Sequence, residues 1–275
     1  AVVYFLTIEP TASFWDCGEY ISTAYKLEVG HPPGAPLFQL IGRFFSLFTT
    51  DVTNVAFLIN SVSALSSAFT IMFLFWTITM LAKKIFSIEK NLITIIGCGL
   101  IGSLTYTFTD SFWFSAVESE VYAMSSLFTA ITFWCILKWE EEFDKPYSWR
   151  WIILVSYLIG LSIGVHLLNL LAIPALILVY YFKTKKVNTK NTIITLILSL
   201  AVLGGIQSVL IPGIVSLAGK FELFFVNTFN LPFNSGTIIY FLFLISLIIY
   251  GLKWSRRNNK PLYNNLILFF TVMLI

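Results

Sequence analysis

The chain has 275 residues, of which 57% are hydrophobic and only 11% are charged, and its formal net charge is +3. A typical soluble domain carries about 25% charged residues, so this composition excludes a soluble globular protein and indicates a chain embedded in lipid. The sequence also has no P-loop, dinucleotide-binding fingerprint, nucleophile elbow or nucleic-acid-binding signature, which excludes the functions that depend on them.

The apolar runs, taken in chain order, predict an all-α, polytopic transmembrane helical bundle. Runs long enough to cross a bilayer occupy 55–82, 91–108, 122–137, 192–215 and 237–252. The run 151–182 is too long for one helix, and its middle, 160–169, predicts a turn between two shorter helices. The sequence begins and ends inside shorter apolar runs, so we expect one transmembrane domain, 1–275, that continues beyond both ends.

The basic residues predict how the helices are oriented in the membrane. Of the 17 Lys and Arg residues, 14 lie in the segments 83–90, 138–150, 183–190 and 253–260, which the positive-inside rule assigns to the cytoplasm. The run 151–182 must then enter the membrane and return, as a hairpin or a re-entrant loop with His166 near its outer tip. The opposite, extracytoplasmic face holds 9–54, 110–120, His166 and 216–236, with nine of the 14 acidic residues and both histidines.

The first extracytoplasmic loop, 9–54, carries the richest set of polar residues. Asp16 and Glu19 are three residues apart, so one helical turn would place both carboxylates on the same face. Neighbouring carboxylates push their pKa values apart, and partial burial raises their affinity for a proton, which suits a general base acting on a hydroxyl group. A helix cap or a solvated acidic turn would explain the same spacing.

A rigid His-Pro-Pro-Gly turn follows at 31–34. Pro33 is predicted to open a helix, 33–48, whose first N–H groups could bind an anion. His31 is expected to contact a phosphate or carry a proton, or alternatively only to cap this helix. Arg43 lies on the same helix, where it could pair with a lipid phosphate or with a carboxylate of the preceding turn, or extend to the membrane surface without a specific partner.

Two further groups of candidate residues lie on the outer face. Glu118, Glu120 and Tyr122 stand where a spanning helix begins, which suits contact with a substrate or a metal ion, although acidic residues there also favour the helix dipole. His166 and Asn169 are polar residues in an otherwise apolar segment, where such residues are often functional. A hydrogen bond between packed helices is the competing explanation. Together with His31 and Arg43, these are the candidate substrate-binding residues.

Four short motifs stand out in combination. They are Ser13-Phe-Trp-Asp16-Cys-Gly-Glu19-Tyr-Ile, Gly30-His31-Pro-Pro-Gly-Ala-Pro36, Val117-Glu118-Ser-Glu120-Val-Tyr122 and Gly164-Val-His166-Leu-Leu-Asn169. The set resembles the GT-C membrane glycosyltransferases, notably the protein O-mannosyltransferases and their bacterial and animal relatives long catalogued as a domain of unknown function. The resemblance covers about the first 180 residues, and its specificity lies in the combination of motifs.

The resemblance implies a GT-C-like bundle with short extracytoplasmic helices. It implies inverting transfer of mannose or a similar hexose from a polyprenyl-phosphate donor to Ser or Thr hydroxyls of exported proteins, outside a bacterial cytoplasmic membrane and without nucleic acid. Asp16 would be the general base, and His31 would contact the substrate. The family carries adjacent Asp-Glu here, whereas Cys17 and Gly18 separate the two carboxylates, so Asp16 and Glu19 both stay candidates. No cofactor is expected, and a requirement for a divalent metal stays open.

Two other functions fit parts of the sequence. A membrane transporter could use Asp16, Glu118 and His166 as a path for a proton or a substrate, but the charged residues collect on one face and no inverted repeat is visible. A non-catalytic membrane subunit that holds partner proteins would need none of these side chains for chemistry. The glycosyltransferase interpretation, by contrast, requires the four motifs to meet at one rim of the bundle.

Overall fold

The computed structural model describes residues 1–32 and 34–274, which form two compact units. Unit 1 is Ala1–Ala172 and unit 2 is Ile173–Ile275. The elements up to the unit boundary are α1 (Val2–Leu6), α2 (Cys17–Lys26), α3 (Pro36–Ser46), η1 (Val52–Asn54), α4 (Val55–Ile85), α5 (Ile88–Thr107), α6 (Asp110–Val117), α7 (Val121–Glu141), α8 (Trp149–Ile163) and η2 (Leu167–Leu171). The remaining elements are α9 (Ala172–Thr184), α10 (Thr189–Gly205), η3 (Ile206–Leu210), α11 (Ile211–Phe229), α12 (Ser235–Arg257) and α13 (Pro261–Leu274).

The described residues contain six helical segments that are long and apolar enough to cross a membrane. These are Val52–Ile85, Ile88–Thr107, Val121–Glu141, Leu167–Thr184, Thr189–Phe229 and Ser235–Arg257. Each of the runs predicted to span lies within one of these segments to within one residue. The chain is therefore an all-α, multi-pass membrane protein, and the predicted fold class is confirmed.

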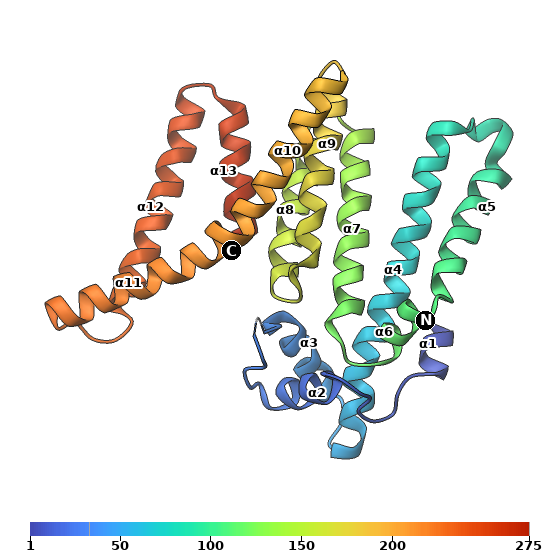
Figure 1. Ribbon diagram of the computed structural model, residues 1–275, viewed down its shortest axis with the longest axis horizontal. Coiled ribbons are helices and arrows are strands. Elements are labelled where there is room, and N and C mark those ends of the chain that lie inside the picture. The colour runs from blue at the N-terminus through green and yellow to red at the C-terminus, as the bar shows by residue number, and fades with distance from the viewer. Residues whose placement is uncertain (33, 275) are drawn as a thin grey trace. The chain divides into compact units, whose positions relative to one another are not determined.

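Helix α4 is the centre of unit 1 (Figure 1). Its 31 residues correspond to roughly 46 Å at 1.5 Å per residue, enough to cross a bilayer. It packs against α3, α5, α6 and α7. The side chains that it buries are mostly small, among them Ser61, Ser63, Ala64, Ser66 and Ser67. Small side chains let neighbouring helices approach closely, which matters in a membrane because lipid competes for apolar contacts.

The two ends of unit 1 differ in charge. Lys84, in the last turn of α4, forms an ion pair with Glu140 near the end of α7, so these two helix ends are neighbours. The turn between α4 and α5 lies at this end, whereas α2, α3 and α6 gather at the opposite end (Figure 1). This arrangement agrees with the predicted separation of a basic face from the face that carries the first outer loop. Which end faces the cytoplasm stays a prediction.

The predicted interruption of the run 151–182 is present. Helix α8 ends before Gly164, and His166 caps η2 by accepting the N–H of Leu168 on Nδ1 at 3.1 Å. The carbonyl of Gly164 also accepts the N–H of Leu37, at the start of α3, at 2.8 Å. The turn after α8 therefore contacts the first outer loop. The return of the chain as a hairpin stays a prediction.

In unit 2, the segment 216–236, which follows the predicted spanning run 192–215, is helical as far as Phe229. The helix that begins with α10 continues through η3 and α11 as one segment, Thr189–Phe229. Lys220 and Glu222 end the apolar run, but charged residues do not break a helix. Pro212 lacks an N–H and crowds the preceding turn. The π-helix η3 directly before it provides a wider turn, which lets the helix pass the proline.

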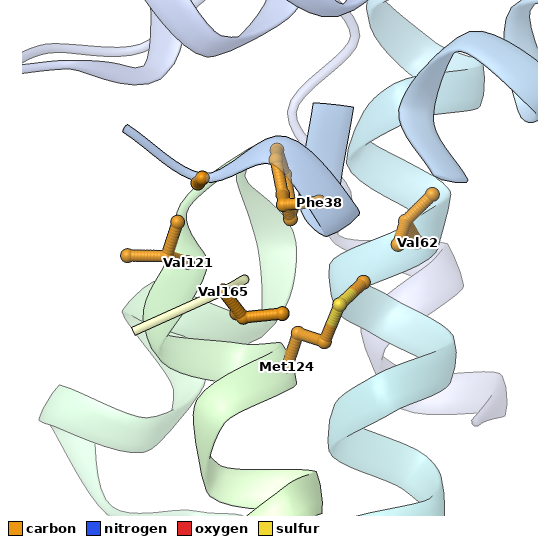
Figure 2. Packing of buried hydrophobic residues seen from close by; sticks show 6 residues of the cluster. Phe38, Val62, Val121, Met124 and Val165 are labelled. Atoms are coloured by element: carbon orange, nitrogen blue, oxygen red, sulfur yellow. The ribbon is translucent and has the colours of Figure 1, made fainter. Parts of the chain in front are cut away.

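A small apolar core fixes α3 against α4 and α7 (Figure 2). The buried residues of this core are Ala35, Phe38, Val62, Val121, Met124 and Val165. Phe38 is fully buried, whereas Phe44 on the same helix is 58% exposed, so α3 presents one face to the core and another to its surroundings. The core holds the first outer loop at the beginnings of α4 and α7.

This core predicts the effect of shortening Phe38. Phe38→Ala should lower the free energy of unfolding by about 3–5 kcal/mol, because it removes a buried ring and leaves a cavity. Phe44→Ala, the matched control on the exposed face, should cost about 1 kcal/mol. Reversible unfolding in mixed detergent micelles measures both values. Equal losses in the two variants would show that the core does not anchor α3.

Candidate active site

Asp16 and Glu19 lie at the beginning of α2. Asp16 is the N-cap residue, and its carbonyl accepts the N–H of Tyr20 at 2.9 Å, while Glu19 is in the first helical turn. Trp15, the residue before the cap, has a left-handed φ of 62° and is 87% exposed. A residue with a side chain adopts this conformation at a cost of about 1–2 kcal/mol. Contacts around the turn must therefore hold it in place.

His31 lies between the two carboxylates of this turn. Its Nδ1 is 3.0 Å from Oε2 of Glu19, and its backbone N–H donates to Oε1 of the same residue at 2.7 Å. Its Nε2 is 3.8 Å from Oδ2 of Asp16. Both carboxylates therefore face one imidazole ring. The alternative that His31 only caps α3 is wrong, because the N-cap residue of that helix is Ala35.

The contact between Glu19 and His31 shifts both groups toward their charged forms. The backbone N–H and the ring of His31 donate hydrogen bonds that lower the pKa of Glu19. The hydrogen bond and the charge of Glu19 raise the pKa of His31, and the charges of Asp16 and Glu120 add to this effect. Both groups are solvent-exposed, so the ion pair adds little to stability. Its consequence is to place a positive charge among carboxylates.

Glu118 and Glu120, in the second outer segment, are only 3% and 5% exposed. Ser13 donates a hydrogen bond to Glu118, and Glu120 is the N-cap residue of α7. Burial raises the pKa of Glu118. Burial, followed by the charges of Asp16 and Glu118, raises the pKa of Glu120 to about 7. The second segment therefore contributes carboxyl groups that hold protons more tightly than usual.

The two outer segments line an open pocket of about 610 Å³. The lining residues are Trp15, Asp16, Asp110, Ser111, Phe114, Ser115, Glu118, Glu120 and Tyr122. Four of them are carboxylic acids and three are aromatic. The pocket therefore offers hydrogen-bond acceptors beside flat apolar rings, which suits a ligand that carries both hydroxyl groups and apolar faces.

Asn60 joins these segments, and sequence analysis missed it. It is fully buried on α4, and its Nδ2 donates to the carbonyl oxygens of Glu9 at 2.6 Å and Thr11 at 3.0 Å. Its Oδ1 accepts from the hydroxyl of Ser119 and lies 3.9 Å from Sγ of Cys17. One amide thus ties both outer segments to α4. The available signal was an amide near the start of an apolar run, since such a residue needs a specific partner.

His166 lies next to the pocket through Tyr122. The two ring centroids are 5.5 Å apart, and Tyr122 lines the pocket. Nδ1 of His166 accepts the N–H of Leu168, so the ring hydrogen of the neutral form is on Nε2. Burial lowers the pKa of His166, which favours this neutral form. Residues of all four sequence motifs therefore lie at one rim of unit 1. His166 is next to the pocket, where its ring contacts Tyr122 of the pocket wall.

Two of the predicted binding residues lie elsewhere. The guanidinium of Arg43 donates to Ser46 at 3.2 Å and lies 5.3 Å from the ring centre of Tyr25. Among the ion pairs of the described residues, none joins Arg43 to a carboxylate of the α2 turn. Asn169 is fully buried and donates to Ser162 at 3.0 Å. Its contacts are those of a residue that packs helices together, which was the competing explanation.

The predicted anion site at the start of the helix after the His-Pro-Pro-Gly turn is not open. The helix begins at Pro36, and Pro33, where it was predicted to begin, lies outside the described residues. Gly34 has a left-handed φ of 73°, which an α-helix cannot contain. The N–H of Leu37, one of the first N–H groups of the helix, is already bonded to the carbonyl of Gly164.

Asp16, Glu19 and His31 are also spaced to hold a metal ion. Each offers one ligand atom, and these atoms lie within 4.8 Å of one another. Carboxylate oxygen and imidazole nitrogen are ligands that Zn²⁺ and related divalent ions accept. A metal would require the neutral imidazole, so metal binding and the Glu19–His31 ion pair exclude each other.

A second cavity, of about 560 Å³, lies between α4, α5 and α7. Its wall is largely apolar and includes Leu74, Ile78 and Phe133. Tyr106 also lines it and stacks on Phe112 of α6, with ring centroids 4.4 Å apart. Because α6 also contributes to the wall of the carboxylate pocket, the two cavities flank the same corner of the fold.

Comparisons with known proteins support the resemblance to the protein O-mannosyltransferases. The family model described as "Protein O-mannosyl-transferase TMEM260 N-terminal domain" matches residues 16–190, which contain every candidate site residue. Two curated relatives are similar to the chain. Protein O-mannosyl-transferase tmem260 of Dictyostelium discoideum is 28% identical over 131 residues, and Protein O-mannosyl-transferase TMEM260 of Mus musculus is 28% identical over 142 residues.

These alignments cover 47% and 51% of this chain, but only 15% and 18% of the two relatives. The chain thus matches less than a fifth of the length of either curated relative. No solved structure matches it significantly.

The ion pair predicts how His31 titrates. Glu19→Gln should lower the pKa of His31 toward the ordinary imidazole value of about 6.5, because an amide does not stabilise the imidazolium by charge. NMR titration of the histidine side chains in detergent measures this shift. Glu28→Gln removes another carboxylate of the same loop, one that lies 4.0 Å from Lys26, and should leave His31 unchanged. An unaltered pKa of His31 in Glu19→Gln would contradict the ion pair.

The buried amide predicts a loss of stability on its removal. Asn60→Ala leaves the carbonyls of Glu9 and Thr11 and the hydroxyl of Ser119 without their partner, at about 1–3 kcal/mol for each group that stays buried. Asn54→Ala, at the exposed start of the same helix, should cost less than about 1 kcal/mol. Unfolding in mixed micelles gives both values, and limited proteolysis should cut Asn60→Ala faster in the first outer loop. A variant as stable as the control would contradict this role.

Proposed function

The chain belongs to the family of the protein O-mannosyl-transferase TMEM260 N-terminal domain, and on this premise we propose that it forms the catalytic membrane part of a glycosyltransferase. It moves mannose or a similar hexose from a polyprenyl-phosphate-linked donor to Ser or Thr hydroxyls of exported proteins. The transfer inverts the anomeric carbon. It takes place on the extracytoplasmic side of a bacterial cytoplasmic membrane, at the end of unit 1 that carries the pocket.

One observation carries this proposal: the pocket joins carboxylates of both outer segments at the rim of a membrane bundle. Asp16 comes from the first segment, and Glu118 and Glu120 come from the second. Trp15 and Phe114 add aromatic surface to the same wall. A hexose has hydroxyl groups that donate to carboxylates and C–H faces that pack on aromatic rings, so the lining suits a sugar.

Hydrogen bonding favours Asp16 over Glu19 as the base. Both oxygens of Glu19 already accept hydrogen bonds from His31, at 2.7 and 3.0 Å. Asp16 faces the same ring at 3.8 Å, which is beyond hydrogen-bond distance, and it lines the pocket. A general base must be within hydrogen-bond reach of the proton that it takes. Asp16 has oxygen atoms available for that purpose.

The transfer is a single displacement. The acceptor hydroxyl oxygen bonds to the anomeric carbon from the face opposite the phosphate, and its proton passes to the carboxylate of Asp16. The bond from the anomeric carbon to the phosphate oxygen breaks, and polyprenyl phosphate leaves with the electron pair. Attack from the opposite face inverts the configuration of the anomeric carbon. Because the displacement is a single step, no covalent sugar–enzyme intermediate forms.

The protonated form of His31 suits the negative charge of the donor. Glu19 favours the imidazolium, which stands beside the base at the edge of the carboxylate pocket. An imidazolium attracts the phosphate and stabilises the charge that develops as the bond to the sugar breaks. Arg43, with Ser46 and Tyr25 as its contacts, is not needed for this role.

The lipid part of the donor needs an apolar surface that opens to the membrane. The second cavity, lined by Leu74, Ile78 and Phe133, offers such a surface between α4, α5 and α7. It lies on the other side of the α5–α6 corner from the carboxylate pocket. An isoprenoid chain in this cavity would leave its phosphate near the rim.

The proposal is tested by removing the base. In the full-length protein reconstituted with radiolabelled polyprenyl-phosphate mannose and a Ser/Thr peptide, Asp16→Asn should lower transfer by about 100- to 10,000-fold. Asp51→Asn is the matched control, because Asp51 lies in the same loop but caps η1, and asparagine caps as well. The control should transfer sugar at the rate of the unaltered protein.

The same assay separates the competing interpretations. Transfer that persists in Asp16→Asn within threefold would reject Asp16 as the base and favour a non-catalytic subunit. Flux of a substrate across vesicles that contain no lipid-linked sugar would identify a transporter. If Glu19→Gln lost as much transfer as Asp16→Asn, the assignment of the base to Asp16 rather than Glu19 would be contradicted.

A further inference from the structure

The pocket at the rim has acidic side chains without matching basic ones. Its acids are Asp16, Asp110, Glu118 and Glu120. None of the described residues that line it is basic. His31 faces Asp16 from the neighbouring turn, but its ring is already bonded to Glu19 at 3.0 Å. Within residues 1–32 and 34–274, the other three acids of the wall take part in no ion pair.

Glu120 shows that these acids are more than a solvated surface. It is only 5% exposed, and it lines the pocket. Although it is the N-cap residue of α7, its side chain makes no cap hydrogen bond. An acid removed from water is costly unless a cation or a hydrogen-bond donor compensates it. A ligand that enters the pocket can provide that compensation.

The donor does not supply the missing positive charge. A hexose is neutral, so its hydroxyl groups can donate hydrogen bonds to these acids but cannot neutralise them. The phosphate of the donor is an anion, which suits the imidazolium of His31 and is repelled by the acidic wall. The other reactant is a polypeptide, whose Lys and Arg side chains are cations. Charge complementarity therefore favours the acceptor as the source of the cation.

Asp110 is the acid of the wall that the proposed chemistry leaves without a role. It is exposed and lies in the first turn of α6, four residues before Phe114, which also lines the pocket. Residues four apart share one face of a helix. A Lys or Arg side chain can pack its stem or its charge against such a ring while its charged end pairs with the acid. The helix dipole explains an acid in the first turn, but not the ring beside it in the same pocket.

We propose that the α6 side of this pocket is the acceptor subsite, and that it favours polypeptides that carry Lys or Arg close to the Ser or Thr that receives the sugar. This inference rests on the proposed function. An extended chain advances about 3.3 Å per residue. The cation must therefore stand within about three residues of the hydroxyl if both are to reach the same pocket.

Peptide binding tests the subsite without sugar transfer. Three fluorescent peptides carry Ala in place of the acceptor Ser and differ at one position two residues away, which is Lys, Gln or Glu. The full-length protein in lipid nanodiscs should bind the Lys peptide about 5- to 10-fold more tightly than the Glu peptide at low ionic strength. This ratio should fall toward one at high salt, because salt screens charges in an open pocket.

Substitutions at Asp110 assign the preference to α6. Asp110→Asn should reduce the ratio to about twofold, and Asp110→Lys should reverse it in favour of the Glu peptide. Glu28→Lys makes the same change in net charge on an acid of the first outer loop that does not line the pocket. This control should keep the ratio of the unaltered protein.

Two results would overturn the inference. One is equal or undetectable binding of the three peptides, and the other is an unaltered ratio in Asp110→Lys. If Asp110→Lys does not fold, the ratio in Asp110→Asn decides the question. Failure of the proposed function is seen separately, as full transfer by Asp16→Asn, because the binding peptides have no acceptor hydroxyl and do not report transfer.

Discussion

The organisation of the rim depends on one buried amide. Asn60 cannot leave its groups unpaired, because a polar group without a partner at this depth costs more than any single apolar contact returns. It satisfies them with two carbonyls of the first outer loop and with Ser119 of the second. These partners come from segments about 100 residues apart. Both outer segments are therefore attached to α4 through the same side chain. Asn60 thus fixes the backbone before Asp16 and the residue between Glu118 and Glu120 to the same helix.

Attachment at the rim produces two environments for carboxyl groups. Glu19 is exposed and is bonded to a histidine, which lowers its pKa, while Glu120 is buried among other acids, which raises its pKa. Both lie near Asp16: the histidine bonded to Glu19 is 3.8 Å from the Asp16 carboxylate, and the charge of Asp16 helps to raise the pKa of Glu120. Groups whose proton affinities are pushed apart in this way suit proton transfer. If all these carboxyl groups had the same environment, their pKa values would be similar.

Much of the fold could be predicted from the sequence because lipid imposes a simple rule. The apolar runs identified the spanning helices, and the Gly-rich stretch before Asn169 identified the break after α8. The predicted helix ends were wrong where a helix and an apolar run do not end at the same residue. Lys220 and Glu222 end a run but not a helix, and the turn at Gly34 delays the start of α3 to Pro36. Composition sets membrane crossing, whereas backbone conformation sets where a helix ends.

The site was harder to predict because identical residue types serve different ends. Asn60 and Asn169 are both fully buried amides in apolar surroundings. Asn60 bonds backbone carbonyls of a distant loop, whereas Asn169 bonds the hydroxyl of Ser162 seven residues away. The difference lies in the partner: an amide that satisfies loop backbone fixes a loop, and an amide that satisfies helix side chains fixes helices. Partners depend on non-local register, so no spacing in the sequence distinguishes the two.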